Sequence, residues 1–558
     1  MTEPADTAGT HAGRRGRRGI VLESLLLAAV ALFFLNFNPL GAMSVGHRYS
    51  QDLVYAWFGG AHWLYPRVSP ELKSRVPDHP RVVVLLVDDT ALALRGAQWP
   101  VPVDFHAQLF AELEALRPRA VLLDFLLIDQ APREAACALL GATASLKRSG
   151  IQAYVAVTSP DELAAMDRAQ CRDEKGQMLL ATKLLRPVSV RLQVDATDFV
   201  NRRYPFEERA SAAAAGSGVA SAAVAMYCDT RPAPGQCVSD LTRDRSSEAG
   251  FELAWAPAGD PFNQRWTRAR CDAVPSATQA ILFKKSLPRE TECPPIATLF
   301  ASALLNPAED ASTGVGNEEL LDLMDGAFVL IGGNFRGAGD LMTTPLHTRL
   351  PGVYYHAVAL DNLFAFQGAP KIRKDFRGHR LSYYVFDLFV LWLLALIFLR
   401  RQAWLNTGRT ASAGPFDLSP AARAFLANVI GRLPTVAWIL GAAVFLLLLA
   451  TYPLLQAIVV LAVVAILVLL EIRVAAEGEL LVRFRSLALY LAALALSLVV
   501  VAAAIWVGYQ WLSLPPVDWV GYLSFAAFGF FVAHTAILEF ARRVDEIHGT
   551  RGSQGGAK

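Results

Sequence analysis

The chain has 558 residues, of which 54% are hydrophobic and 18% charged, and its formal net charge is +2. Its mean hydropathy is +0.33. In soluble domains roughly a quarter of all residues are charged, so this composition excludes a disordered chain, a collagen-like fibre and an ordinary cytosolic enzyme. The near-zero net charge argues against a nucleic-acid partner. The apolar surplus indicates a membrane protein whose first partner is the lipid bilayer.

Six tracts are apolar and long enough to cross a hydrocarbon core as helices, which takes about 20 residues. They are 20–42, 382–400, 434–451, 454–471, 486–508 and 519–541. A basic tail, residues 1–19, precedes them, and residues 542–558 form a Gly/Ser-rich tail that we expect to be disordered. The first tract resembles a cleaved signal peptide, but its apolar run is long and no clear A-x-A site follows, which favours an uncleaved anchor.

The distribution of Lys and Arg orients the predicted bundle of six spans. The inside segments hold 16 Lys and Arg residues, whereas the short outside turns 451–453 and 509–518 hold none. Because cytoplasmic loops carry the positive excess, both termini are predicted in the cytoplasm. Residues 44–381 are then exported, into the periplasm if the membrane is a bacterial inner membrane.

The exported segment alternates strand and helix patterns. Short apolar runs predict buried parallel strands at 81–87, 119–125, 151–157 and 326–331, with a further candidate at 187–194. Helices are expected over 104–116, with Asp104 as N-cap, and over 354–366. This alternation predicts an α/β domain with a mostly parallel sheet covered by helices. Residues 200–250 are rich in Ala, Ser, Gly and Arg and predict a loop-bearing insertion.

All six cysteines lie in the exported segment, which indicates disulfides, because disulfides persist in oxidising compartments. They are Cys137, Cys171, Cys228, Cys237, Cys271 and Cys293. A zinc site needs closely spaced pairs, and the sequence has no C-x₂₋₄-C motif. A Cys228–Cys237 bridge would close the one short loop, whereas Cys137–Cys171 and Cys271–Cys293 follow only from sequence order.

Acidic side chains gather where the first two predicted strands end. Asp88 and Asp89 end the first strand, and Asp124 ends the second. The carboxyl ends of parallel strands meet at the crevice where ligands bind, so we expect a carboxylate cluster that Asp340 joins. Like charges raise carboxylate pKa values, and a polar or cationic molecule, or a hard cation such as Ca²⁺, would relieve the repulsion. The alternative is that each Asp only caps a helix or turn.

A Gly-rich run from Gly332 to Asp340 follows the late strand and contains Asn334, a further candidate ligand-binding residue. Backbone amides in such a turn can bind an anion, but the run matches neither G-x-G-x-x-G nor the P-loop, which favours a plain tight turn. No hydrolase, metalloprotease or kinase motif occurs. The sequence therefore predicts no enzyme and no cofactor, and it leaves the question of a metal open.

These runs carry a family resemblance. The stretch from Arg81 to Asp89, then Gln98-Trp99-Pro100, then Arg117 to Asp124, resembles the type-2 CHASE (CHASE2) domain. Further matching runs are Phe328 to Gly332, Gly339-Asp340, Thr344-Pro345, Leu350 to Val353, His356-Ala357 and Leu360 to Leu363, together with Asp52 and Tyr55. The resemblance covers about 45–380, mainly at its two ends.

The resemblance implies an extracellular sensory module of bacterial receptors, set between an N-terminal anchor and further membrane helices. Members of this family typically end in a cytoplasmic kinase or nucleotide cyclase, but here only about seventeen residues follow the last predicted span. We therefore expect a sensor of an unknown periplasmic ligand that acts on a separate membrane or cytoplasmic signalling protein. A homo-oligomer is compatible with this expectation.

Two alternatives remain open. One is a transporter, for which the polar intramembrane residues Asp387 and His534 would be the signal, because such residues usually face the bundle interior. The other is a structural subunit of an envelope complex with a periplasmic docking domain. Dependence on a ligand separates the sensor from the docking domain.

Overall fold

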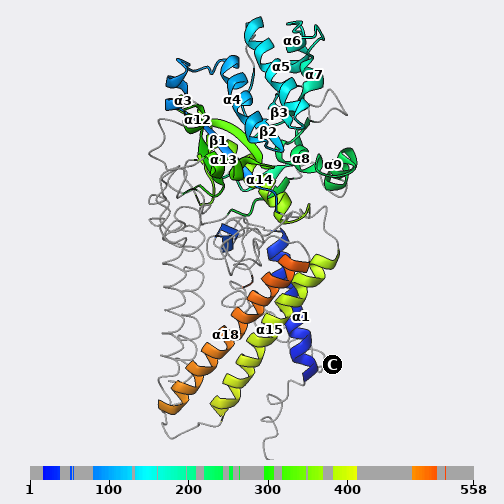
Figure 1. Ribbon diagram of the computed structural model, residues 1–558. Coiled ribbons are helices and arrows are strands. Elements are labelled where there is room, and N and C mark those ends of the chain that lie inside the picture. Colours follow the sequence, from blue (N-terminus) through cyan, green and yellow to red (C-terminus); the bar gives the residue numbers. More distant parts are fainter. Residues whose placement is uncertain are drawn as a thin grey trace, which may run out of the picture. The chain divides into compact units, whose positions relative to one another are not determined.

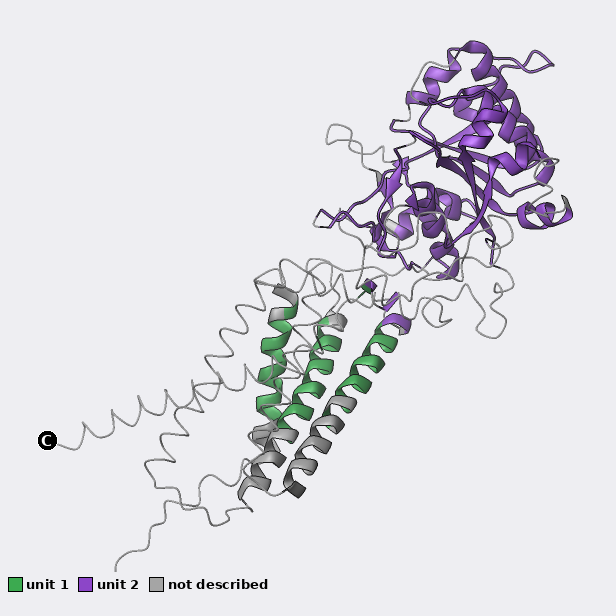
Figure 2. Cartoon of the chain, turned by 90° about the vertical axis from the view of Figure 1, so that its left-hand side faces the viewer, with its two compact units in different colours: residues 1–51, 379–508, 516–558 green, residues 52–378, 509–515 purple. Residues whose placement is uncertain are grey.

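The computed structural model describes a subset of the chain, and the structural statements concern those residues. They are residues 17–37, 51–52, 54–55, 79–127, 132–159, 161–196, 198–208, 219–242, 250–255, 263, 294–306, 317–337, 339–346, 350–368, 381–410, 480–511 and 522. The chain divides into two compact units, shown in two colours in Figure 2. Unit 1 holds residues 1–51, 379–508 and 516–558, and unit 2 holds residues 52–378 and 509–515.

Unit 2 is built on a six-stranded sheet (Figure 1). Its strands are β1 (Val82–Asp88), β2 (Ala120–Leu123), β3 (Gln152–Ala156), β4 (Leu185–Val188), β9 (Ala297–Phe300) and β10 (Phe328–Asn334). Their spatial order is β4-β3-β2-β10-β1-β9, and every pair is parallel. The late strand β10 inserts between β1 and β2, so the carboxyl ends of these three strands are neighbours.

The predicted parallel α/β domain is confirmed, with differences at two places. The strands expected at 81–87, 119–125 and 151–157 are observed within one or two residues of those bounds. The candidate at 187–194 is instead β4, which begins and ends earlier because it pairs with β3 through Leu185 to Val188. The sequence pattern did not predict β9, a four-residue strand at the sheet edge.

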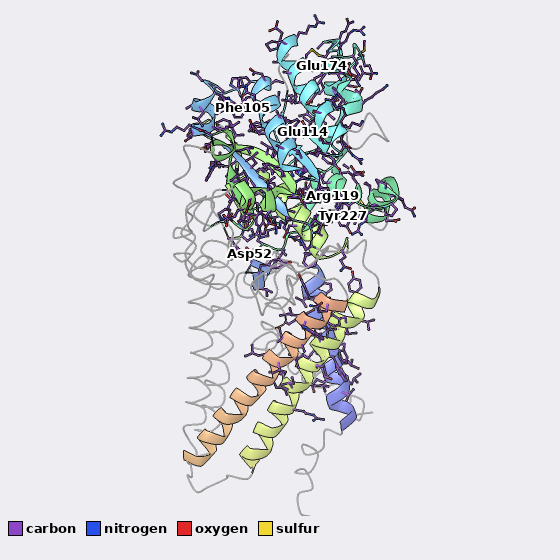
Figure 3. All side chains as sticks on the ribbon, viewed as in Figure 1. Asp52, Phe105, Glu114, Arg119, Glu174 and Tyr227 are labelled. Carbon is purple, nitrogen blue, oxygen red and sulfur yellow. A yellow bond between two sulfur atoms is a disulfide. The ribbon has the colours of Figure 1, made fainter. Side chains whose placement is uncertain are left out.

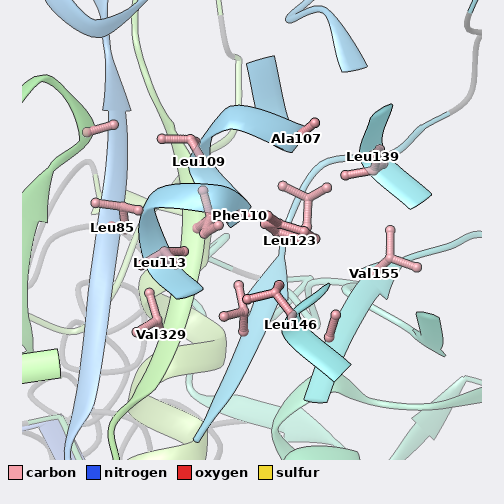
Figure 4. Packing of buried hydrophobic residues seen from close by; sticks show 14 of the residues in the cluster. Leu85, Ala107, Leu109, Phe110, Leu113, Leu123, Leu139, Leu146, Val155 and Val329 are labelled. Atoms are coloured by element: carbon pink, nitrogen blue, oxygen red, sulfur yellow. The ribbon is translucent and has the colours of Figure 1, made fainter. Parts of the chain in front are cut away.

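Helices cover both faces of the sheet. They are α3 (Asp89–Leu94), α4 (Val103–Leu116), α5 (Arg133–Arg148), α6 (Asp161–Asp167), α7 (Ala181–Leu184), α12 (Ala301–Leu305), α13 (Asn317–Met324) and α14 (Val353–Ala365). Residues Val83, Leu85 and Val87 of β1 join the core with α4 and α5, shown in part in Figure 4. Alternate residues of a strand point to opposite faces, and α14 packs on β1 and β10 from the other side.

Helix α4 begins one residue earlier than predicted, and the expected N-cap is wrong. Pro102 occupies the N-cap position in an extended conformation, and Asp104 is the second residue of the helix. A proline fixes its own φ and lacks an N–H, so it fits a helix beginning. Asp104 still lies in the first turn, where a negative charge is favourable to the helix dipole.

The structure describes part of the insertion. It contributes β5 (Arg203–Pro205), β6 (Glu207–Glu208), β7 (Val219–Ala220), α8 (Ala222–Cys228), α9 (Pro234–Thr242) and β8 (Gly250–Glu252). It is tied to α14 through Tyr204, whose hydroxyl lies 2.8 Å from Nδ1 of His356. Just after the insertion, the N–H of Ala254 donates to Oδ1 of the buried Asn362 at 2.7 Å. These contacts make the insertion part of the domain rather than a separate loop.

Two of the suggested disulfides are present. Cys137–Cys171 joins α5 to the turn after α6, with Cα atoms 5.1 Å apart. Cys228–Cys237 joins α8 to α9, with Cα atoms 5.5 Å apart. Cys271 and Cys293 lie outside the described residues, and no free cysteine occurs among the residues that the structure describes.

Among the described helices, unit 1 contains α1 (Arg17–Phe37), α15 (Leu381–Thr410) and α18 (Leu480–Trp511) as far as residue 508. Their buried apolar residues form one cluster, which includes Leu27, Leu394 and Val501. In the described part of the chain, no helix has the length and apolar character of a candidate membrane span. The tracts at 434–451 and 454–471, and His534, lie outside the described residues, so the six-span bundle stays a prediction.

Candidate functional site

The candidate residues at the carboxyl edge of the sheet do not all share one environment. Asp88 ends β1 and is the N-cap of α3, where its Oδ1 accepts from the N–H of Ala91 at 3.4 Å. The same carboxylate accepts from the N–H of Ser302 at 3.3 Å and from its hydroxyl at 3.1 Å. Asp88 therefore satisfies donors at the beginnings of two helices, α3 and α12, as an aspartate N-cap usually does.

Asp89 and Asn334 lie beside Asp88. Asp89 is exposed, and its Oδ1 accepts from the N–H of Arg336, which fixes the turn after β10. Asn334 is the last residue of β10 and pairs in register with Asp88 of β1. Asp89 thus has a defined backbone partner, and Asn334 is placed at the same edge.

The Gly-rich run is divided between a strand and a turn. Gly332 and Gly333 belong to β10, contrary to the predicted turn, and the chain turns only at residues 335–337. A Cβ at Gly332 would overlap the side chain of Val353, so this glycine permits the close approach of α14 to the sheet. Gly337 and Gly339 adopt φ values of 96° and 64°. The glycines therefore serve packing and turning.

Asp124 is different from Asp88. It follows β2, its N–H donates to the carbonyl of Ile331 at 2.9 Å, and its side chain is only 7% exposed. Its Oδ2 is buried and has no hydrogen-bond partner among the described residues. A buried carboxylate oxygen without a donor is costly, so a ligand that donated a hydrogen bond to this atom would remove that cost.

Asp340 lies against the beginning of α14. A Cβ at Gly352 would overlap both carboxylate oxygens of Asp340, so only glycine fits at this position. The N–H of Gly352 also donates to the backbone carbonyl of Asp340 at 3.0 Å. A helix N-terminus favours a negative charge, which partly offsets the burial of this carboxylate.

His356, in the first turns of α14, completes the cluster. Its side chain is 1% exposed, and its Nε2 lies 3.9 Å from Oδ2 of Asp124, beyond hydrogen-bond range. Its Nδ1 is 2.8 Å from the hydroxyl of Tyr204 on β5, and that hydroxyl accepts from the N–H of Ala223 at 3.0 Å. The His356 ring also has a hydrogen bond with the backbone of Val190, which opposes the effect of burial on its pKa. If the Tyr204 hydroxyl donates to Nδ1, the ring proton is on Nε2.

The electrostatics follow from burial. Burial, and after it the charge of Asp340, raise the pKa of Asp124 well above its usual value. Burial also raises the pKa of Asp340, while the N–H of Gly352 opposes this rise. Burial lowers the pKa of His356 to about 3. The structure thus brings Asp124 and Asp340 into electrostatic contact, with a neutral imidazole beside them.

No group of three or more His, Cys, Asp or Glu side chains among the described residues is arranged to hold a metal ion. The sequence pattern marked Asp124 and Asp340 but gave no role to His356 or Tyr204. His356 was visible as one of three polar residues, with Asp361 and Asn362, in a largely apolar helix, the kind of position that indicates a buried hydrogen bond. Tyr204 comes from the insertion, and no local pattern marks it.

A second buried polar cluster holds the segment that follows α1. Arg202, 6% exposed, donates from Nε and Nη2 to the two carboxylate oxygens of Asp52 at 2.9 and 2.8 Å. Asp198 accepts from the same guanidinium at 2.8 Å. Figure 3 labels Asp52 on this segment. Such a bidentate ion pair is geometrically specific, so it fixes the position of Asp52, the first residue of unit 2.

Taken together, these features define an α/β domain that is fastened by disulfides and has a buried polar cluster at the carboxyl edge of a parallel sheet, where such folds bind ligands. The chain belongs to the CHASE2 family, since the CHASE2 domain model matches residues 27–399. CHASE2 is a family of extracellular sensory domains. No curated protein and no solved structure matches the chain.

Proposed function

We propose that this chain is a bacterial inner-membrane sensor whose CHASE2 domain binds a small cationic ligand at Asp124, Asp340 and His356 on the periplasmic side. The single observation behind this proposal is the buried Oδ2 of Asp124, which lacks a donor among the described residues and lies beside a second buried carboxylate. A cation with N–H groups, such as an amine, would supply both the charge and the donor.

The position of His356 supports a route for the signal. Its ring contacts Tyr204 of the insertion and faces Asp124 of the sheet, while its backbone is part of α14. Residues 366–380 connect α14 to α15. A ligand that draws Asp124 away from His356 would alter the packing of α14, and α14 precedes α15 directly in the chain. We propose that the helices of unit 1 pass this change to a separate signalling protein.

The membrane topology of the proposal rests on the Lys and Arg distribution. Alkaline phosphatase folds only outside the cytoplasm, so its fusion after Gly150 should be active and its fusion after Ser412 inactive. An active fusion at Ser412 would contradict the five C-terminal spans. Mild-detergent co-purification followed by mass spectrometry would identify the signalling partner.

The other functions are less well supported. Asp387 accepts from the hydroxyl of Tyr522 at 2.6 Å, which gives this carboxylate a structural partner. We also propose that the chain is not an enzyme, because the sequence contains no G-x-S-x-G, H-E-x-x-H or kinase motif. A docking subunit would bind a partner without responding to a cation.

The test uses the full chain in detergent, with Ca²⁺ and the diamine putrescine as probes. The wild type should bind putrescine saturably, and Asp124→Asn should abolish this binding while the protein stays folded. Asp88→Asn is the matched control, because it removes a carboxylate at the same edge that already caps two helices. Equal putrescine binding by wild type and Asp124→Asn would contradict the site. Binding of Ca²⁺ but not of putrescine would indicate that the ligand is a metal ion rather than an amine.

A further inference from the structure

The amino edge of the same sheet contains a pocket that the sensor site does not use. Its volume is about 520 Å³, and it is lined by residues that precede β1, β2 and β10 and by part of α13. Arg81 precedes β1, Arg119 precedes β2, and Gly326 lies just before β10. Strand β1 has seven residues, so this edge is about 20 Å from Asp88 and Asp124 at the other end. The two sites are therefore separate.

Three guanidinium groups line this pocket, and two of them are not neutralised by the described residues. Arg81 donates from Nη1 to the carboxylate of Asp322 at 3.0 Å. Arg117 and Arg119 have no ion pair with a described residue. One further carboxylate, Asp325, is exposed at the rim. The pocket thus keeps an excess of positive charge after its internal pair is counted.

Backbone hydrogen bonds fix the main chain at both arginines, whose side chains are exposed. The N–H of Arg119 donates to the carbonyl of Ala327 at 2.8 Å, and its guanidinium lies 5.7 Å from the ring centre of Phe328 (Figure 3 labels Arg119). Arg117 is the C-cap of α4, with a left-handed φ of 53°, and its carbonyl accepts from Gly326. Helices usually place glycine at such a position. The arginine therefore occupies a strained backbone conformation, as residues at functional sites often do.

We propose that this pocket binds a small anion through carboxylate or phosphate oxygens, and that Arg117 and Arg119 hold it. The planar fork of arginine matches both kinds of oxyanion with two parallel hydrogen bonds. The volume suits a small molecule. This anion site is independent of the cation site at the carboxyl edge, so the domain has two ligand sites of opposite charge preference.

The test measures binding of succinate and of inorganic phosphate to the full chain in detergent by calorimetry, with neutral succinamide as the ligand control. Saturable binding of succinate alone identifies a carboxylate ligand, and binding of phosphate alone identifies a phosphate ligand. Both results support the proposal. Failure of both anions to bind, or equal binding of succinamide, would overturn it.

Substitutions assign the residues. Arg117→Gly suits the left-handed backbone and should fold at least as well as the wild type, yet weaken anion binding by about tenfold or more, as should Arg119→Gln. Arg95→Gln removes one exposed positive charge outside the pocket and should leave the affinity unchanged. Asp325→Asn should strengthen binding, because it removes a competing carboxylate. Wild-type affinity in both Arg117→Gly and Arg119→Gln, or equal weakening in Arg95→Gln, would overturn the assignment.

Discussion

Two regions of the carboxyl edge, the end of β1 and the end of β2, each carry an aspartate, but the two carboxylates differ in their hydrogen bonding. Asp88 accepts from donors at the beginnings of α3 and α12. Asp124 is buried, with one carboxylate oxygen that has no donor among the described residues. The difference lies in how soon a helix begins after each strand. Helix α3 begins directly after β1 and presents free N–H groups, whereas α5 begins only at Arg133, well beyond the end of β2.

The comparison teaches that an aspartate at the end of a parallel strand is a structural residue where a helix begins at once. It becomes a candidate ligand residue where no helix supplies donors and a second carboxylate approaches. Asp340 provides that second carboxylate, and it can do so because Gly352 leaves space for it. Substitutions and acidification at the two ends of this edge test this difference between Asp88 and Asp124.

The largest effect is expected from Gly352→Ala at the Asp124 end. The added methyl group would overlap the Asp340 carboxylate, and overpacking of this kind costs about 1–3 kcal/mol of unfolding free energy. Denaturant unfolding of the full chain in detergent measures it. The control is Gly141→Ala in α5, where nothing lies within 4 Å and alanine should stabilise the helix by up to about 1 kcal/mol. Equal stability of Gly352→Ala and wild type would show that Asp340 is free to move.

Acidification is expected to act next, through His356. Its pKa is about 3 in the folded protein, below the ordinary value of 6.5, so the unfolded chain binds more protons between these two values. Stability conferred by the neutral ring is therefore lost as the pH falls from 6.5 towards 3, on the order of 2 kcal/mol by pH 5. Thermal melts of the wild type and His356→Gln should converge as the pH falls.

The quantity to compare is the stability difference between the wild type and His356→Gln, because burial also lowers the pKa of His106 to about 3. His106 is present in both proteins, so its contribution cancels in this difference. A pH-independent difference would mean that Asp124 ionises together with a protonated His356, as an ion pair.

At the other end of the edge, Asp88→Ala should cost about 1–2 kcal/mol, because it removes the cap of α3 and the acceptor for Ser302. Asp88→Asn should lose only a few tenths of a kcal/mol, since asparagine caps helices nearly as well. Chemical denaturation distinguishes the two. If Asp88→Asn were as destabilising as Asp88→Ala, the charge of Asp88, rather than its hydrogen bonds, would be the important property.

The last change, Asp124→Asn, is expected to raise stability at neutral pH, because asparagine keeps the shape of the side chain and cannot carry the buried like charge. The sign follows from the raised pKa. The folded state binds the extra proton, so the wild type loses stability as the pH rises from the ordinary aspartate value through the folded one. Asp124→Asn should not show this decline. An identical decline in melting temperature for both proteins would rule out Asp124 as its source.

Much of the fold followed from local patterns. The run at 81–87 is apolar at every buried position, and such a run must be covered on both faces, which predicts a parallel sheet. The end of each strand then marked Asp88, Asp89 and Asp124 as neighbours at one edge. The predictions that differed from the structure concern strands whose bounds are set by pairing with a neighbouring strand. The fourth strand ended where its pairing with β3 ended, and β9 had too few residues to give a pattern.

The class of domain, the strand-end carboxylates and the segment that holds the two described disulfides all follow from the sequence alone. These properties depend on residue type and short spacing, which are visible in one dimension. Only the tertiary structure decided which carboxylate is satisfied and which is not. That outcome depends on α14 packing closely on β10 through Gly332, which brings Asp340 and His356 to Asp124, and on Tyr204 reaching His356 from the insertion. Contacts between residues more than a hundred positions apart form because burial of apolar faces brings whole elements together, and no local pattern encodes them.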